Sequence, residues 1–205
     1  YASADAIDRF RSDPELRREL IFHPELCTYY YGFVHTKPPF NDARVRRAFS
    51  AAIDRQFIVD NVTRGEEIPA TTFAPPGVFG APTPGTMGQG YDPELAQASL
   101  QAFLNEKELS LAEFNAAYDI VLGYTTSEAN TKIAAAIQAM WQEELGIEII
   151  TDTLEWNAYL ELIDKTTPIE TMYHIHAQIW CADYPDENNW THEVFNSEVG
   201  LNEVR

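Results

Sequence analysis

Segments with the pattern of β-strands alternate with segments with the pattern of helices along most of this sequence. Aromatic or alternating apolar residues mark the strands, and apolar residues at helical spacing mark the segments between them. The predicted strands are residues 27–35, 117–126, 147–154 and 171–180, and the main predicted helices are residues 41–62, 92–106 and 127–146. Shorter helices are expected in the opening segment and after residue 154. This order predicts an α/β fold with a mixed or mainly parallel sheet flanked by helices.

Residue signals at the helix ends support this assignment. Asp92 followed by Pro93 begins the second main helix, and Ser127 and Gly146 bound the third. Residues 64–93 contain six prolines and six glycines, so we expect them to pack as an irregular covering loop. In the first main helix, apolar residues at every fourth position predict one buried stripe, formed by Val45, Phe49, Ile53 and Phe57.

The acidic composition limits the classes of partner. With 32 acidic and 14 basic residues, the net charge is −18 at pH 7. A field of that sign repels phosphate backbones and anionic lipid heads, so we expect no nucleic-acid partner and no membrane-surface binding. No apolar run approaches the ~18 residues of a membrane span. The chain has 205 residues and begins without methionine, which suggests a fragment of a longer protein.

The stretch "WCADYPDENNW" at the end of the last predicted strand is the main candidate site. In open α/β sheets, ligands bind beyond the carboxyl ends of strands, where "GYTTSE" is also expected. Aromatic residues gather at such ends and at helix starts: Trp156, Trp180, Tyr184 and Trp190. Together with an acid, they suggest a small-molecule or peptide pocket with apolar walls and one anionic anchor.

Other chemistries find less support in the sequence. His174 and His176 could face one side of a strand, but no third ligand has matching spacing, so we expect neither metal nor cofactor. Asp183, Asp186 and Glu187 could suggest general acid or base catalysis, yet the sequence pairs none of them with a carboxylate at a second loop, and no nucleophile motif occurs. A hydrolase that combines Asp183 with a carboxylate outside this chain stays a rival hypothesis, as does a scaffold role. Cys27 and Cys181 could be free thiols or, in an exported protein, a disulfide.

Several stretches resemble the family 5 extracellular solute-binding proteins of ABC importers. They are "TYYYGF…PPFNDARVRRAFSAAIDRQFIV…IPATTFAPPG", "MWQEELGIEI" followed by "EWNAYL", and "WCADYPDENNW". The resemblance implies a lobe like those of type II periplasmic binding proteins, without enzymatic activity, that closes with a second lobe on a ligand. Residues 1–25 would then be a crossover segment from the other lobe. Residues 26–205 would be a ligand-binding lobe that lacks its carboxyl end.

The resemblance also implies a binding site. In the oligopeptide-binding branch, the acid of the WCADY-type loop, here Asp183, pairs with the α-ammonium of the peptide. Trp180, Ala182 and the backbone around Cys181 would line the same site. Two further aromatic residues match positions that face the side-chain pockets of relatives: Tyr30 of "TYYYGF" and Trp156 of "EWNAYL".

The same resemblance predicts a disulfide between Cys27 and Cys181, because the matching positions are bridged in some relatives. It implies an oligopeptide ligand, ABC-transporter permease partners, a monomeric fragment, and a periplasmic or extracellular location with or without a lipoprotein anchor. Ala177 stands where some oligopeptide binders have arginine, and Thr125 where relatives often have asparagine. Other branches bind nickel chelates, haem or oligosaccharides on the same scaffold, so a non-peptide ligand is the alternative.

Overall fold

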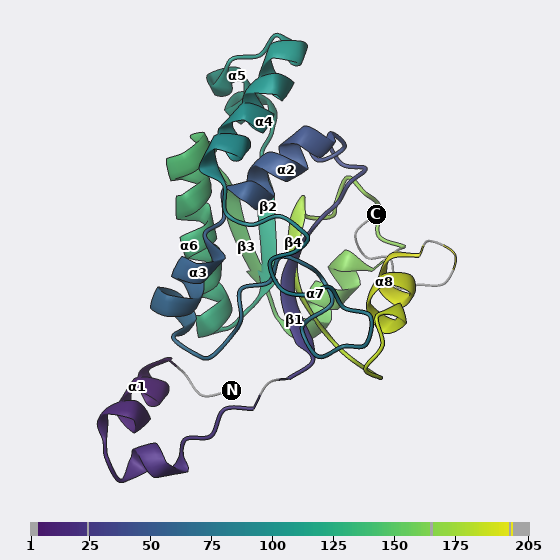
Figure 1. Ribbon diagram of the computed structural model, residues 1–205. Coiled ribbons are helices and arrows are strands. Elements are labelled where there is room, and N and C mark those ends of the chain that lie inside the picture. Colours follow the sequence, from purple (N-terminus) through teal and green to yellow (C-terminus); the bar gives the residue numbers. More distant parts are fainter. Residues whose placement is uncertain (1–3, 24, 165, 197, 199–205) are drawn as a thin grey trace.

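A four-stranded sheet with helices packed on it forms the centre of the molecule (Figure 1). The computed structural model describes residues 4–23, 25–164, 166–196 and 198. The strand order is β1-β4-β2-β3, and the sheet is mixed, which confirms the predicted α/β class. The strands are β1 (Cys27–Phe33), β2 (Val121–Thr125), β3 (Ile150–Leu154) and β4 (Ile175–Cys181).

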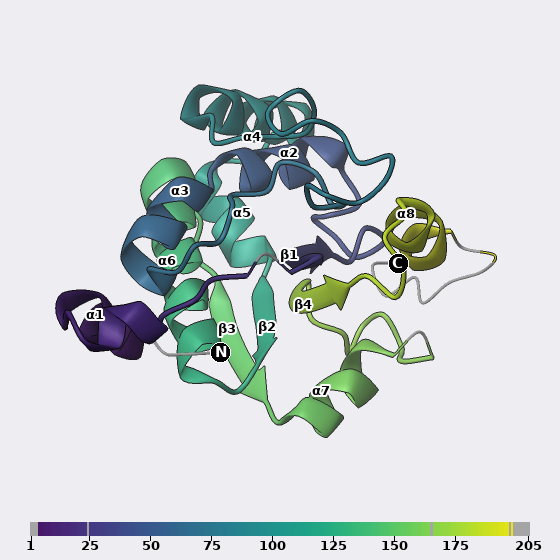
Figure 2. The ribbon, with the colours of Figure 1, turned by 60° about the horizontal axis from the view of Figure 1, so that its bottom comes forward.

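The sheet is divided into two pairs of strands. β1 runs antiparallel to β4 over seven residue pairs, from Cys27↔Cys181 to Phe33↔Ile175. β2 runs parallel to β3 over its whole length, but it pairs with β4 only at Leu122↔Ile175 and Gly123↔His176. Beyond Gly123, β2 and β4 therefore form a fork, which opens toward the carboxyl ends of both strands. Figure 2 shows β1 and β4 on one side of this fork and β2 and β3 on the other.

The largest apolar cluster lies between one face of the sheet and three helices. These helices are α2 (Ala43–Ala51), α4 (Pro93–Lys107) and α6 (Glu128–Leu145). Phe49 and Trp141 are buried where they meet, and the Trp141 indole Nε1–H donates to the Phe49 carbonyl at 2.8 Å. Burial of each such side chain stabilises the fold by about 1.5–3 kcal/mol, so this cluster holds the helices on the sheet.

Two smaller clusters cover the opposite face. One joins α7 (Trp156–Ile163) to the sheet through five buried residues: Val34, Tyr159, Ile163, Met172 and Tyr173. The other joins α8 (Asn188–Phe195) to the covering loop through Ala74, Val78 and Trp190. The proline- and glycine-rich segment thus packs as an irregular cover, as expected.

The predicted helix caps are present. The side chain of Asp92 accepts from Leu95 N–H, that of Ser127 accepts from Asn130 N–H, and Gly146 adopts the left-handed conformation (φ 66°) that ends α6. The single helix predicted over 41–62 is wrong. The helix ends after α2, and a new one begins because Asp54 acts as an N-cap whose carboxylate accepts from the Phe57 N–H. The new segment consists of α3 (Arg55–Phe57) and the π-helical η2 (Ile58–Thr63). Phe57 is consequently exposed, whereas the other three stripe residues are buried.

Two helices were not predicted. α5 (Leu111–Ala117) begins at a capping box formed by Ser110 and Glu113, a signal that the sequence does contain. α8 has Glu187 at its N-cap position, and the Glu187 side chain makes no capping hydrogen bond, so the sequence offers no comparable start signal. The strands β2, β3 and β4 are also shorter at their starts than the predicted ranges.

The opening segment forms α1 (Ala4–Ser12) and the short 3-10 helix η1 (Leu16–Glu19), at the lower left of Figure 1. Arg64 joins α1 to the rest of the chain through ion pairs with Asp5, at 2.9 Å, and with Asp8. Arg11 adds an ion pair with Glu66 at 2.7 Å. Within the described ranges, no helix has both the length and the apolar character needed to cross a membrane.

Candidate functional site

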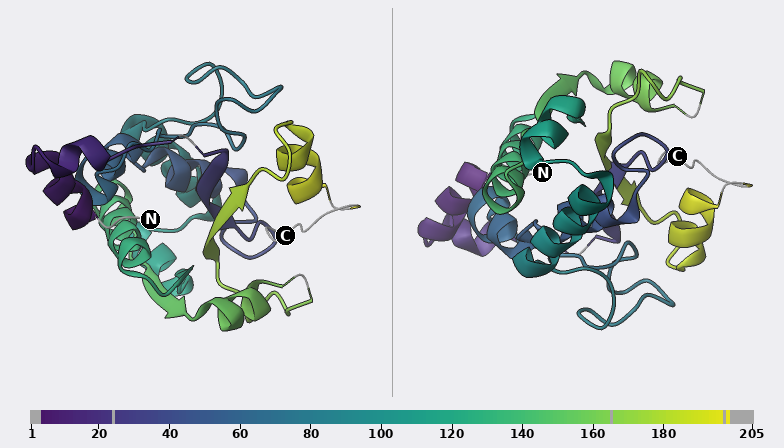
Figure 3. Two further views of the ribbon diagram at one scale, coloured as in Figure 1. Left: turned by 90° about the horizontal axis from the view of Figure 1, so that it is seen from below. Right: turned by 90° about the horizontal axis from the view of Figure 1, so that it is seen from above.

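The carboxyl ends of β2, β3 and β4 lie at one edge of the sheet, together with the start of β1. This follows from the register, since these three strands are parallel and β1 is antiparallel to β4. The left view of Figure 3 looks toward this edge, with α7, α8 and the covering loop around the ends of β1 and β4. The loops that follow the strands place Ala182, Asp183 and Trp156 at the same edge.

A disulfide between Cys27 and Cys181 fixes this edge. The two residues are directly paired in the β1–β4 register, and their sulfur atoms are 2.04 Å apart. The bridge predicted from the resemblance is therefore present. It closes a loop with a sequence separation of 154, which in the chain-entropy model stabilises the fold by about 5 kcal/mol. It also fixes the end of β4 two residues before Asp183.

Asp183 lies exposed just beyond β4, and the buried side chain of Asn189 orients it. The Asn189 Oδ1 atom accepts from the Asp183 backbone N–H at 3.0 Å, and its Nδ2 donates to Asp183 Oδ2 at 3.3 Å. The same Nδ2 donates to Glu193 Oε2 at 2.7 Å. Glu193 Oε1 accepts from the Tyr184 hydroxyl at 2.5 Å. Among the described residues, Asp183 has no ion-pair partner, so its carboxylate is available to a cationic group.

The end of β4 presents a free strand edge next to this carboxylate. The Ala182 N–H donates to the Leu26 carbonyl at 2.8 Å, so even-numbered residues of β4 bond to β1. In an antiparallel pair, the alternate residues direct their N–H and C=O groups to the other side. For Ile179 and Cys181, that side faces the fork, where the part of the chain described here contains no pairing strand. These backbone groups can therefore pair with an extended ligand.

The aromatic residues of the site differ in exposure. Trp156 is 52% exposed at the first position of α7, and Tyr184 is also exposed. Trp180 is half-buried against the Trp190 cluster, and its indole nitrogen is buried with no hydrogen-bond partner among the described residues. The prediction that Trp190 belongs to an accessible aromatic set is wrong. Trp190 is fully buried because α8 turns it under the covering loop, where it contacts Phe73 with ring centroids 5.2 Å apart.

Tyr30 is half-buried on β1, and its ring meets the Phe73 ring edge-to-face at 4.9 Å. The neighbouring residues Tyr29 and Tyr31 point to the other face, with their hydroxyl oxygens 3.5 Å apart. Burial raises the pKa of Tyr29 to about 12 and that of Tyr31 further, so both phenols are neutral at physiological pH. The structure thus groups Trp180, Cys181, Ala182 and Asp183 at the end of β4 and just beyond it, with Tyr30 on the paired strand and Trp156 at the start of α7.

The histidine pair does not form a metal site with its described neighbours. His174 Nδ1 accepts from the Val121 N–H at 3.1 Å, and His176 is fully buried in the sheet. Burial lowers the pKa of both imidazoles to about 4. No group of three or more potential metal-binding side chains of His, Cys, Asp or Glu occurs in the described ranges.

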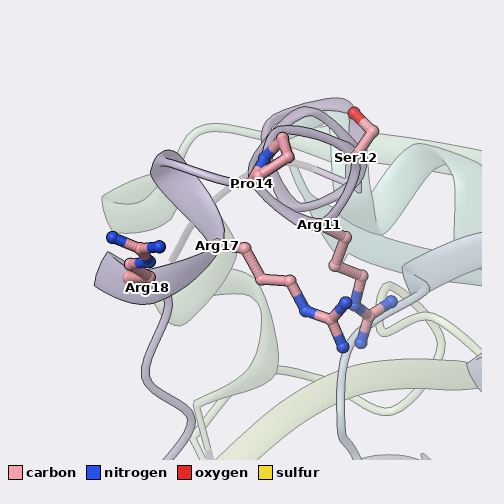
Figure 4. Close-up of a pocket in the computed structure, with 5 residues that line it drawn as sticks. All are labelled: Arg11, Ser12, Pro14, Arg17 and Arg18. Carbon is pink, nitrogen blue, oxygen red and sulfur yellow. The ribbon is translucent and has the colours of Figure 1, made fainter.

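A separate cavity of about 480 Å³ lies at the opening segment (Figure 4). In Figure 1 this segment lies at the lower left, away from α7 and α8. It is lined by Arg11, Ser12, Pro14, Arg17 and Arg18. Figure 4 shows the guanidinium groups of Arg11 and Arg17 close together and that of Arg18 pointing away. This cavity shares no residue with the site around Asp183.

Sequence reasoning identified the loop but missed the residues that support it. Asn189 and Glu193 lie one helical turn apart on α8, and Tyr159 lies on α7. An i, i+4 pair of polar residues is common on exposed helix faces, so the pattern alone gave no sign that Asn189 is buried against Asp183.

The family described as "Bacterial extracellular solute-binding proteins, family 5 Middle" matches residues 1–201. The oligopeptide-binding protein OppA of Bacillus subtilis is 31% identical over 193 residues, which cover 92% of this chain and 34% of that protein. The probable deoxycholate-binding periplasmic protein YgiS of Escherichia coli is 32% identical over 182 residues, covering 87% of this chain and 32% of YgiS.

Among solved structures, the murein tripeptide-binding protein MppA of Escherichia coli superposes with a TM-score of 0.66 at 30% identity. The match covers 82% of this chain and 31% of MppA. The chain thus spans about a third of the length of the relatives that it matches.

Proposed function

This chain belongs to the bacterial extracellular solute-binding proteins of family 5, and we propose that it forms part of the oligopeptide-binding site of an ABC importer. The observation that carries the proposal is the free edge of β4 at Ile179 and Cys181, which leads directly to the Asp183 carboxylate. Peptides of any sequence share an extended backbone and an α-ammonium group. A strand edge followed by one oriented carboxylate is complementary to both features.

The proposed binding mode assigns a role to each residue. The ligand backbone pairs with Ile179 and Cys181, while Asp183 accepts hydrogen bonds from the ammonium group and fixes the register of the peptide. Trp180 and Ala182 line the wall of the site next to the bound peptide. Trp156, exposed on α7, and Tyr30 on β1 face ligand side chains. Charge-assisted hydrogen bonds are stronger when water is excluded, so Asp183 contributes most in a closed cleft.

We assign residues 1–25 to a crossover from a second lobe and residues 26–205 to the ligand-binding lobe. Micromolar affinity requires about −8 kcal/mol, which needs a ligand enclosed on most sides. A single lobe exposes one side of the ligand, so we expect strong binding only in the full-length protein. The length of the relatives leaves room for that second lobe.

The remaining functional assignments follow from family membership. We propose that the full-length protein is not an enzyme, acts in the periplasm or at the outer cell surface, and delivers its ligand to permease subunits of an ABC transporter. A lipid anchor would fit this placement. We propose no nucleic-acid partner, because the net charge of −18 would repel a phosphate backbone.

A non-peptide ligand is the second candidate. It is supported by the 32% identity between this chain and YgiS, which is described as a probable deoxycholate-binding protein. The two candidates differ in what Asp183 must bind. A bile acid carries a carboxylate rather than an ammonium group, so a bile-acid site would gain nothing from this acid.

Calorimetry with matched peptides tests the proposal on the full-length protein. We expect trialanine to bind with micromolar affinity or better. N-acetyl-trialanine, which has the same backbone but no α-ammonium, should bind at least tenfold more weakly. Equal affinity for the two peptides, or binding of deoxycholate alone, would overturn the proposal.

A further inference from the structure

The Tyr159 hydroxyl lies where β2 and β4 separate. Tyr159 is fully buried on α7, and its hydroxyl oxygen is 2.7 Å from the Ala177 carbonyl oxygen and 3.1 Å from the Gly123 carbonyl oxygen. These two carbonyls belong to different strands, one from each side of the fork. The last pair of residues that joins the strands is Gly123↔His176, so the hydroxyl takes the place that the next step of the ladder would occupy.

A second side chain donates a hydrogen bond to a carbonyl on the β2 side of the fork. On β2, the Asn130 amide Nδ2–H donates to the Thr125 carbonyl at 3.0 Å. Side-chain donors therefore bond to the carbonyls that face the fork: Tyr159 contacts those of Gly123 and Ala177, and Asn130 contacts that of Thr125. Backbone carbonyls that already have donors gain little from strand pairing, so these contacts oppose closure of the fork.

We infer that Tyr159 is a positioning residue that holds the fork open, so that Ile179 and Cys181 stay available to a ligand backbone. This inference rests on the proposed function. Tyr159 acts through β4 and through α7, which it anchors to the sheet at the same point. In Figure 2, α7 lies beside the interval between the two pairs of strands, where such an anchor is needed.

The chain offers a matched control for this role. Tyr173 belongs to the same buried cluster, and its ring stacks on that of Tyr159 at 6.3 Å. Its hydroxyl donates to Asp152 Oδ2 at 2.9 Å, on β3, and does not contact the fork. Tyr159→Phe and Tyr173→Phe each remove one hydroxyl and keep the aromatic ring, so both variants retain the apolar cluster.

Amide hydrogen exchange on the ligand-free, full-length protein is the first measurement. In Tyr159→Phe, we expect the amides of Thr125 and Ile179, which face the fork, to exchange roughly tenfold more slowly, because the two strands can pair once the hydroxyl no longer occupies the Ala177 carbonyl. In Tyr173→Phe, these amides should exchange as in the wild type. Unchanged or faster exchange of these amides in Tyr159→Phe, or the same slowing in both variants, would overturn the inference.

Peptide binding is the second measurement. We expect Tyr159→Phe to weaken trialanine binding roughly tenfold, a change of about 1.4 kcal/mol. The loss should shrink for a peptide whose backbone N–H groups are methylated, since that ligand cannot use the free edge. Tyr173→Phe should bind both peptides like the wild type. If the wild-type protein binds no peptide, the proposed function fails, and the exchange data alone decide whether Tyr159 holds the fork.

Discussion

The buried side chain of Asn189 bonds to both the backbone N–H and the carboxylate of Asp183. The amide thereby fixes the direction of a carboxylate that is itself exposed. It also separates Asp183 from Glu193, since its Nδ2 atom donates to both acids. The anionic anchor of the proposed site is thus pre-oriented by a residue that need not touch the ligand.

Removal of this amide should weaken ligand binding without abolishing it. We expect Asn189→Ala to lower peptide affinity roughly tenfold, because Asp183 loses its orientation and lies beside an unscreened Glu193. Asn188→Ala is the control, since the Asn188 amide donates to the Tyr184 hydroxyl at 2.7 Å and not to Asp183. Calorimetry on the two full-length variants checks this, and equal losses in both would contradict it.

Neutralisation of the anchor should have a larger effect. We expect Asp183→Asn to weaken peptides with a free amino terminus by about 2–4 kcal/mol, because an ammonium group in a closed cleft loses its charged partner. N-acetylated peptides should be little affected. Asp186→Asn removes a nearby carboxylate and should leave both affinities unchanged. A loss for acetylated and free peptides alike would show that Asp183 supports the fold rather than the ammonium group.

The disulfide should dominate the stability of the lobe. We expect the Cys27→Ser, Cys181→Ser double variant to lose about 4–5 kcal/mol of unfolding free energy in denaturant titrations, since the bridge closes a long loop. Reductant should shift the wild type by a similar amount and leave the variant unchanged. Mass spectrometry of non-reduced protein should show the 2 Da deficit of one bridge. Free thiols in oxidised protein would contradict this prediction.

Stability should decrease with acid through His176. Burial lowers its pKa from about 6.5 to about 4, so between these values the unfolded chain binds a proton that the folded chain does not. The stability from this group is full above pH 6.5 and falls as the pH approaches 4, by about 2–3 kcal/mol.

His176→Leu should remove about half of the slope that His174 and His176 produce between pH 7 and pH 4, as measured by urea unfolding, because His174 keeps its own lowered pKa. Its stability at pH 7 should change little, because the described structure offers no hydrogen-bond partner to the imidazole nitrogens. The same slope in both proteins would assign the acid sensitivity to other groups.

The sequence predicted those parts of the fold that depend on local pattern. The stripe residues Val45, Phe49 and Ile53 are buried as their spacing indicates, and the caps at Asp92 and Ser127 start their helices. The break at Asp54 was missed because a strong apolar period across 45–57 outweighed one competing cap. The residue pattern alone left the Cys27–Cys181 pairing open, and the family resemblance predicted it.

The supporting parts of the site could not be predicted, because they depend on how distant elements meet. The β2–β4 fork exists where α7 inserts Tyr159 between two carbonyls, and no local pattern records that contact. Trp190 looks accessible in the sequence, yet the covering loop brings Phe73 over it. Asn189 acquires its role only when α8 folds back on the end of β4.

A crystal structure of the full-length protein with a bound tripeptide tests the central claim most directly. We predict that the α-ammonium nitrogen of the tripeptide lies within about 3 Å of an Asp183 carboxylate oxygen. We also predict backbone hydrogen bonds from the ligand to Ile179 or Cys181. A ligand seated elsewhere, with Asp183 in open solvent and the β4 edge unoccupied, would contradict the account.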